Sequence, residues 1–398
     1  MPETRRKLLL LADAGCHSGF ATVSHNIFDR LASQFDWEVH CLAVNYQGDP
    51  WDTPMKLYVP NFKERADILG QSRIIELMGK VMPDAVVFVQ DPQVVLNILA
   101  NNPWDRDQVL WRGISHPSGY TYKPPIIAYL AVDGYDNPRS WDVLAERVTR
   151  VAMSHHGQAA MPEAPVVWHG VDTSVYRPRD KAEAKRELGF DPARFLVLRV
   201  DKNTWRKDYP ATWRALRPIL RRHPDIDVHW HCRPNASDGY DLANVRWNDE
   251  DIRERVTLSA DLGGFIGWPE ERLATLFAAA DLFVSTAWGE GFGLNLLQAI
   301  ASGTPVIAQD CSAITEVVGP GGILIRPKER TYVPMGQQQC LPDVERFTYW
   351  IEHLYNAPKQ REALARAGVE HAAKFSWPEA ARRFNDIIER EVAKTAAS

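Results

Sequence analysis

Residues 282–309 read LFVSTAWGEGFGLNLLQAIASGTPVIAQ, and this stretch decides the expected fold. Its apolar start, Leu282–Thr286, predicts a strand, and the glycine-rich residues 288–293 predict a loop. A short helix is expected over Leu294–Ser302, and a second strand over Val306–Ala308. A strand, a loop, a helix and a second strand in this order form the repeating unit of a parallel α/β sheet.

The loop before this helix suits an anionic ligand. Gly289, Gly291 and Gly293 have no Cβ atom, so the backbone can approach a ligand closely. The first amides of a helix have no partner inside the helix, and its dipole makes that end positive, which favours phosphate or pyrophosphate. Glu290 could not hold phosphate but could accept hydrogen bonds from hydroxyls beyond it. Gln298, just over two helical turns later, could face another hydroxyl-rich group, so the pattern indicates a nucleotide sugar.

The same residues carry a family resemblance. Glu290-Gly291-Phe292-Gly293-Leu294, followed by x-Leu-Leu-x-Ala-x-Ala-x-Gly-x-Pro-Val, resembles the signature of family 4 retaining glycosyltransferases (group 1) of the GT-B fold. The resemblance implies that Glu290 contacts the donor sugar and that residue 298 contacts the ribose hydroxyls. The family has a second Glu where this chain has Gln298, so nucleotide affinity or choice is expected to differ. A structural turn with an incidental acid is the alternative interpretation.

Composition limits the remaining possibilities. The chain has 398 residues, enough for two domains, and its 45% hydrophobic and 24% charged residues are ordinary for a soluble protein. A net charge of −5 gives no general attraction to nucleic acid or anionic membrane. Five cysteines without Cys-x-x-Cys argue against a disulfide framework or a zinc site. The longest aliphatic run, Leu8–Ala12, is too short to span a bilayer or to make a convincing signal peptide. A cytoplasmic protein is therefore expected.

Strands and helices alternate along the chain, which predicts an α/β protein with two Rossmann-like, doubly wound domains. The resemblance implies that these domains face a cleft. We expect an N-terminal acceptor-binding domain over residues 1–172 and a C-terminal nucleotide-sugar-binding domain over residues 173–376. Residues 377–398 are expected to form a helix that packs back on the N-terminal domain, as the resemblance implies. Residues 326–342 are expected to form an irregular loop.

A glycine-bearing loop follows the first expected strand, Lys7–Ala12. It contains Gly15 and Gly19 and leads into a helix with Val23 and Leu31 on one face. Loops at this edge of α/β sheets often bind ligands, but the full G-x-G-x-x-G fingerprint is missing. The resemblance implies that this loop reaches towards the donor phosphate and the acceptor, and a simple tight turn is the alternative.

A basic loop follows the expected strand Phe195–Val200. Lys202, Arg206 and Lys207 cluster there, and Arg199 is a weaker candidate. A diphosphate leaving group carries about two charges, which cations stabilise as the sugar–phosphate bond breaks. The run from Lys202 to Lys207 also matches the basic-Asn-x-x-Arg-Lys pattern of the resembling family. Alone, it would be read as a solvated basic loop.

Three further positions are candidates. The resemblance implies nucleobase contact near Trp268, largely through backbone groups, although a tryptophan is often simply part of the core. Many relatives place a histidine after the strand that here spans Ile126–Val132, where this chain has Asp133. We prefer Asp133 as the group near the sugar, because a strand end followed by glycine points at the ligand edge. His116 is the rival.

The resemblance also implies the chemistry. It implies retention of anomeric configuration by front-face attack, with a phosphate oxygen as the base and no protein nucleophile. The expected catalytic residues are Glu290, Asp133 and Lys207. No metal is implied, and no cofactor is expected beyond the nucleotide-sugar co-substrate, which we expect to be UDP- or GDP-linked.

Other features have less specific interpretations. His229 and His231 share a strand face, where a metal pair would lack an evident third ligand. A basic helix face could touch lipid head groups in a peripheral contact, but a solvated face is favoured; its residues are Arg214, Arg217, Arg221 and Arg222.

The acceptor is not indicated by the sequence. It could be a lipid, a polysaccharide, a small molecule, a protein or a hydroxylated base in DNA. Two other function classes remain open. A nucleotide-sugar epimerase shares the expected architecture, although the Glu-Gly-Phe-Gly signature does not favour it. An inactive sugar-nucleotide-binding protein is kept open by Gln298.

Overall fold

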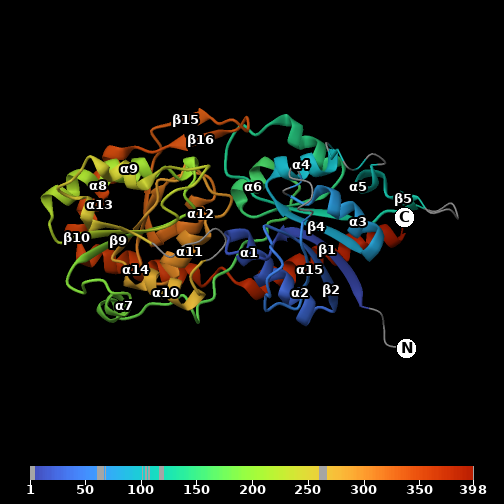
Figure 1. The fold of residues 1–398 in the computed structure, drawn as a ribbon, viewed down its shortest axis with the longest axis horizontal. Coiled ribbons are helices and arrows are strands. Elements are labelled where there is room, and N and C mark those ends of the chain that lie inside the picture. The colour runs from blue at the N-terminus through green and yellow to red at the C-terminus, as the bar shows by residue number, and fades with distance from the viewer. Residues whose placement is uncertain are drawn as a thin grey trace. The chain divides into compact units, whose positions relative to one another are not determined.

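The chain forms two α/β units, seen in a computed structural model that describes residues 5–60, 67, 69–100, 102, 103, 105, 108–115, 121–259 and 267–397 (Figure 1). Unit 1 comprises Met1–Val132, Asn137–Gly170 and Trp377–Ser398. Unit 2 comprises Asp133–Asp136 and Val171–Ser376. The predicted class, two doubly wound α/β units, is confirmed.

A parallel six-stranded sheet forms the centre of unit 1, in the order β3-β2-β1-β4-β7-β8. The order reverses between β1 and β4, as in the dinucleotide-binding arrangement of doubly wound sheets. Its central strands are apolar and almost fully buried, because helices cover both faces of such a sheet. The strands are β1 (Arg6–Asp13), β2 (Trp37–Val44), β3 (Lys56–Tyr58), β4 (Ala85–Gln90), β7 (Ile126–Leu130) and β8 (Thr149–Ala152).

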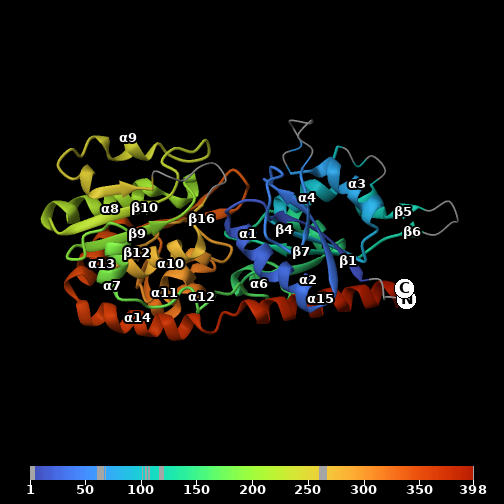
Figure 2. The same ribbon diagram turned by 60° about the horizontal axis from the view of Figure 1, so that its bottom comes forward.

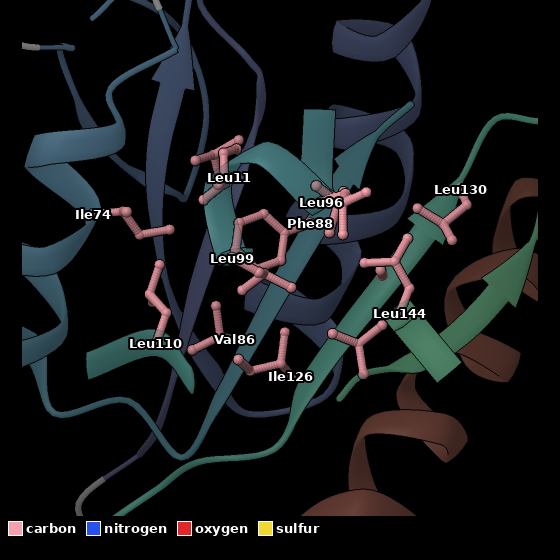
Figure 3. Close-up of a cluster of buried hydrophobic side chains, with 14 of the residues drawn as sticks. Leu11, Ile74, Val86, Phe88, Leu96, Leu99, Leu110, Ile126, Leu130 and Leu144 are labelled. Atoms are coloured by element: carbon pink, nitrogen blue, oxygen red, sulfur yellow. The ribbon is translucent and has the colours of Figure 1, made fainter. Parts of the chain in front are cut away.

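Leucine, isoleucine and valine side chains from this sheet and its helices form one packed core. Figure 3 shows Leu11, Phe88 and Leu96 of this core gathered with residues from α3 (Gln71–Val81), α4 (Pro92–Ala100) and β7. A small antiparallel pair, β5 (Ile114–Ser115) and β6 (Thr121–Tyr122), lies outside the main sheet. The helices are α1 (Gly19–Ser24), η1 (His25–Asp29), α2 (Arg30–Gln34), α3 (Gln71–Val81), α4 (Pro92–Ala100), α5 (Val109–Arg112), η2 (Arg139–Glu146), α6 (His155–Ala160) and α15 (Trp377–Ala397).

The last helix, α15, belongs to unit 1. It packs against η1 and α2, and Figure 2 shows it running beneath α2. Trp37 Nε1 donates a buried hydrogen bond to Asn385 Oδ1 at 2.9 Å, and the rings of Phe28 and Phe384 meet edge to face. These contacts join the last helix to the first strands and helices of the same unit.

Unit 2 repeats the architecture of unit 1. Its parallel sheet has the order β11-β10-β9-β12-β13-β14, which again reverses beside the first strand. The strands are β9 (Phe195–Val200), β10 (Ile226–His231), β11 (Val256–Leu258), β12 (Leu282–Val284), β13 (Val306–Gln309) and β14 (Gly322–Ile325). A separate antiparallel hairpin follows, formed by β15 (Glu329–Tyr332) and β16 (Gln338–Leu341).

The helices of unit 2 flank this sheet. α8 (Tyr209–Arg222) and α13 (Val344–Asn356) pack against each other on the face where the cluster of Trp213, Trp230 and Phe347 is buried. The helices are α7 (Lys181–Glu187), η3 (Trp205–Lys207), α8 (Tyr209–Arg222), α9 (Leu242–Trp247), η4 (Arg253–Arg255), α10 (Glu270–Ala279), α11 (Leu294–Ala301), α12 (Ile314–Val318), η5 (Gly319–Gly321), α13 (Val344–Asn356) and α14 (Pro358–Ala372). No helix in the described ranges is long and apolar enough to cross a bilayer.

Three local predictions differ from the structure. The expected loop at 326–342 contains the β15–β16 hairpin, because Gln338–Leu341 pairs in register with Glu329–Tyr332. The expected helix through Val23 and Leu31 is interrupted by one π-helical turn, η1. Strand β12 is shorter than the expected Leu282–Thr286 and ends at Val284, and Thr286 Oγ1 donates to the backbone oxygen of Asp208 at 2.7 Å. The sequence also predicts a strand and turn over Leu262–Trp268, and most of this range lies outside the described residues.

Acid is expected to destabilise unit 1 through His169. This ring is buried between Tyr129 and Trp377, and burial lowers its pKa to about 3. A histidine kept neutral by the fold contributes stability above its unfolded pKa of about 6.5, and this contribution is lost as the pH falls towards the folded pKa. We expect the loss of this contribution to lower the free energy of unfolding by about 2 kcal/mol between pH 7 and pH 5.

Denaturant unfolding of the wild type and of His169→Phe at both pH values measures this loss. The variant should show a smaller fall than the wild type. Equal falls would mean that His169 is not held neutral by the fold.

Candidate functional site

The two loops singled out in the sequence meet at the carboxyl edge of the unit 2 sheet. Strands β9 and β12 are neighbours there, with Leu282 opposite Val197 and Phe283 opposite Leu198. This is the position where the strand order reverses, and ligands of open α/β sheets bind beside such a reversal. The loop after β9 carries Lys207, and the loop after β12 carries Glu290.

Opposite charges from these two loops are in direct contact. Lys207 Nζ forms an ion pair with Glu290 Oε1 and lies 2.8 Å from Asp201 Oδ1. Arg206 Nη1 lies 3.6 Å from Glu290 Oε2 and donates to the backbone oxygen of Gly289 at 2.8 Å. Glu290, Lys207 and Arg206 are thus brought together, and both Glu290 and Lys207 are buried.

Local hydrogen bonds explain why the loops hold this shape. Asp208 adopts a left-handed backbone conformation with φ of +49°, and its carboxylate caps α8 by accepting from Ala211 N at 3.0 Å. The same carboxylate accepts from Trp288 Nε1 at 2.9 Å, and Trp288 N donates to Arg206 O at 2.9 Å. The basic loop is therefore tied to the glycine-rich loop on both sides of Lys207.

The Asp201 carboxylate holds the Lys207 ammonium in place through an ion pair. Asn295 Nδ2 donates to Asp201 Oδ1 at 2.8 Å, and Arg199 Nε lies 3.2 Å from Asp201 Oδ2. Burial opposes ionisation of Asp201, but the charges of Lys207 and Arg199 outweigh it and hold the pKa of the carboxyl below its ordinary value. Asp201 therefore stays charged and fixes the position of the Lys207 ammonium.

Arg199 has a structural role. Its guanidinium is fully buried over the ring of Tyr209 and donates to the backbone oxygens of Lys207 and Asp208. It also donates to Thr286 Oγ1 at 2.9 Å. Because these bonds hold the loop from inside the protein, Arg199 supports the site rather than facing a ligand.

The glycine-rich loop leads directly into α11. Gly293 caps this helix with a left-handed φ of +98°, which requires glycine. Glu290 N donates to Ser312 Oγ at 2.9 Å, and the Phe292 ring packs edge to face on Phe375. Gln298 is buried on α11, in the second turn of the helix that follows the loop.

Asp133 belongs to unit 2, although the strand before it, β7, belongs to unit 1. Its Oδ2 lies 3.4 Å from Arg206 Nη1, and its Oδ1 accepts from Gln337 Nε2 at 2.7 Å. Asp133, the preferred candidate for the group near the sugar, therefore lies beside the basic loop. His116, its rival, lies outside the described residues.

Two other predicted donor-site residues of unit 2, Lys202 and Trp268, contact different partners. The Lys202 side chain is 74% exposed and pairs with Asp238 at 3.0 Å. Trp268 packs edge to face on His231, and the Arg272 guanidinium lies 3.7 Å from its ring centre.

Gly15 and Gly19 belong to the β1–α1 loop of unit 1. A Cβ at Gly15 would overlap the Tyr46 ring, whereas Gly19 begins α1 behind its cap, Ser18.

Two lesser candidates have structural explanations. His229 Nδ1 lies 2.8 Å from Thr257 Oγ1 of β11, and His231 Nδ1 lies 2.8 Å from Ser259 Oγ just after it, so both rings are bonded to hydroxyls. Three of the four α8 arginines form ion pairs: Arg217 and Arg221 with Asp249, and Arg222 with Glu352. These pairs neutralise much of the basic face.

Several residues that build the site were not predicted from the sequence. Asp201 and Asn295 lie next to singled-out positions, and the end of a predicted strand was the available signal for Asp201. Ser312 and Gln337 gave no signal, because their contacts depend on loops whose paths only the folded structure reveals.

Part of the chain matches a known family. Residues 200–333, which contain the basic loop and the glycine-rich loop, match the family model Glycosyl transferases group 1. The chain is 31% identical over 234 residues to a D-inositol 3-phosphate glycosyltransferase of Segniliparus rotundus, covering 58% of this chain and 48% of the relative. It is 33% identical over 183 residues to the lipopolysaccharide core biosynthesis mannosyltransferase LpsB of Rhizobium meliloti, covering 45% and 50%. The chain thus spans about half the length of these curated relatives.

Solved structures share the whole fold. The chain superimposes on sucrose-phosphate synthase from Thermosynechococcus elongatus with a TM-score of 0.71 and 18% identity, covering 99% of this chain and 100% of the other. It superimposes on Anabaena Alr3699/HepE, solved with UDP and glucose, with a TM-score of 0.68 and 15% identity, covering 97% and 100%. The fold is therefore GT-B.

Proposed function

We propose that this chain is a glycosyltransferase that takes a sugar from a nucleotide-sugar donor and transfers it to an acceptor hydroxyl. One observation carries the proposal: a hydroxyl-binding acid, Glu290, touches the cations Lys207 and Arg206 where the strand order of unit 2 reverses. The family match over residues 200–333 covers these same loops and supports it.

Each charged group has a proposed role toward the donor. Lys207 and Arg206 bind the diphosphate, as a point charge and a planar fork respectively. Glu290 accepts hydrogen bonds from the donor sugar, and Gln298 bonds the ribose hydroxyls without charge. Before the donor binds, Glu290 neutralises Lys207, while Asp201 keeps the ammonium in place throughout.

The proposed reaction retains the anomeric configuration and needs no metal. The bond between the anomeric carbon and the phosphate oxygen breaks, and the acceptor oxygen bonds to that carbon on the same face. The acceptor proton passes to the departing phosphate oxygen, which serves as base. Lys207 and Arg206 stabilise the charge that develops on the diphosphate, and Asp133 steadies positive charge on the sugar.

The donor is proposed to be UDP- or GDP-linked. The acceptor class is open to a lipid, a polysaccharide, a small molecule or a hydroxylated DNA base. The names of the curated relatives make D-inositol 3-phosphate and a lipopolysaccharide core the first acceptors to try.

A panel of nucleotide sugars tests the proposal. A bound ligand at 100 times its dissociation constant should stabilise the chain by about 2.7 kcal/mol, so thermal-shift screening will identify the donor. Acceptors are then added and release of nucleoside diphosphate is measured. Stabilisation followed by acceptor-dependent release supports a transferase. Isomerisation of the sugar would indicate an epimerase, and no stabilisation by any donor would contradict the proposal.

A further inference from the structure

The β15–β16 hairpin contributes a buried side chain to the candidate site. Its turn is closed by Val333 N donating to Gln337 O at 2.9 Å, and Gly336 adopts a left-handed φ of +82°. Gln337 follows this turn and is only 2% exposed. The hairpin thus places a neutral amide inside unit 2 rather than in solvent.

The hairpin pairs through its backbone with the segment that carries Asp133. Tyr135 and Gln338 form an antiparallel bridge with backbone hydrogen bonds of 2.8 and 2.7 Å. A Cβ at Gly134 would lie 2.7 Å from Gln337 Cδ, so glycine is needed for this close approach. The guanidinium of Arg330 lies 3.5 Å from the centre of the Tyr135 ring. These contacts fix Asp133 relative to Gln337.

Gln337 donates a hydrogen bond to one carboxylate oxygen of Asp133, and the other carboxylate oxygen faces Arg206. Its Nε2 donates to Asp133 Oδ1 at 2.7 Å, while Asp133 Oδ2 lies 3.4 Å from Arg206 Nη1. Gln337 Oε1 is buried and accepts no hydrogen bond from the described part of the chain, so the bond to Asp133 is what orients the amide. The same Arg206 nitrogen donates to Gly289 O and lies near Glu290.

We propose that Gln337 is a positioning residue for the reaction: its amide holds the Asp133 carboxylate in the orientation that faces Arg206 and the donor sugar. This inference rests on the proposed function, because it assigns Gln337 a part in that same site. A neutral donor suits the position. Glutamate there would repel Asp133, and alanine would leave Asp133 Oδ1 without its donor.

A double-mutant cycle tests the inference, with kcat and KM measured by nucleoside diphosphate release from the donor that the panel identifies. Gln337→Ala is expected to lower kcat at least 10-fold while changing the donor KM less than 3-fold. Asp133→Asn should also lower kcat, and adding Gln337→Ala to it should cause no further loss. Such non-additivity is expected if Gln337 acts only through Asp133.

Gln339→Ala is the matched control, because Gln339 is 1% exposed in the same hairpin and has no hydrogen bond to Asp133 among the described contacts. It should leave kcat within 2-fold of the wild type. The Gln337→Glu variant adds a second measurement, the pH dependence of kcat, whose expected change would not result from loss of folding. Its two facing carboxyls can share a proton at low pH, so its kcat relative to the wild type should recover as the pH falls from 7 to 5.

The outcomes separate two failures. If the wild type turns over no nucleotide sugar, the proposed function itself fails. If the wild type is active, the inference on Gln337 is overturned by unchanged kcat in Gln337→Ala, by additive losses in the double variant, by an equal loss in Gln339→Ala, or by Gln337→Glu showing no recovery at low pH.

Discussion

Replacing Lys207 by methionine is expected to lower kcat for sugar transfer by about 100- to 1,000-fold, the effect of removing one group that stabilises charge in a transition state. Lys207 is buried in contact with both Glu290 and Asp201, so no solvent cation can take its place beside the leaving diphosphate. The loss should appear in kcat, measured as nucleoside diphosphate release at saturating donor.

Lys202→Met is the matched control for this prediction. It removes the same charge from the same loop, but its side chain is 74% exposed and pairs with Asp238. Its kcat should stay within a few-fold of the wild type. Equal losses in the two variants would show that the general charge of the loop matters and that the buried position does not.

A double variant distinguishes loss of catalysis from loss of folding. The cluster holds three cations (Arg199, Arg206, Lys207) and three anions (Asp133, Asp201, Glu290), so removing Lys207 alone leaves an unbalanced buried charge. Such imbalance typically costs about 3–5 kcal/mol. Adding Asp201→Asn restores the balance. The double variant should recover thermal stability but remain inactive.

Glu290→Gln is expected to lower kcat/KM by about 10- to 150-fold, since hydrogen bonds to a charged group contribute about 1.5–3 kcal/mol. The amide keeps the shape of the side chain but cannot accept from sugar hydroxyls as strongly as a carboxylate. Glu290→Gln leaves one cation unbalanced, but folding should persist because Lys207 keeps its ion pair with Asp201 and the Arg206 side chain is 31% exposed to solvent.

Steady-state kinetics with the identified donor measure this change. Glu345→Gln, at an exposed position in the first turn of α13, serves as the control for loss of one negative charge. A Glu290→Gln enzyme with wild-type kcat/KM would remove Glu290 from the proposed donor contacts.

The contact between Lys207 and Glu290 could be anticipated from the sequence. Both residues follow apolar segments that predict parallel strands, and the carboxyl ends of such strands meet at one edge of a sheet. The glycines between 288 and 293 pointed to the same edge. Apolar strand patterns are strong signals because a fully buried strand tolerates few polar residues.

The residues that hold the site residues in place could not be predicted from strand patterns. Arg199 looked like a weak ligand candidate, yet its burial beside Asp201 makes it part of the interior. Asp133 was placed by its strand end, but its bond to Gln337 joins residues 204 positions apart in sequence. The hairpin that makes this bond has short, mostly polar strands, so it gives no apolar alternation that predicts a strand.

The central claim is that a nucleoside diphosphate binds where Lys207 and Glu290 meet. Calorimetric titration of UDP, GDP and their monophosphates into the wild type, Lys202→Met and the Lys207→Met/Asp201→Asn double variant tests it most directly. The account predicts that the wild type and Lys202→Met bind one diphosphate at least 10-fold more tightly than its monophosphate, and that the double variant loses this preference. A double variant that keeps the preference for the diphosphate would contradict the account.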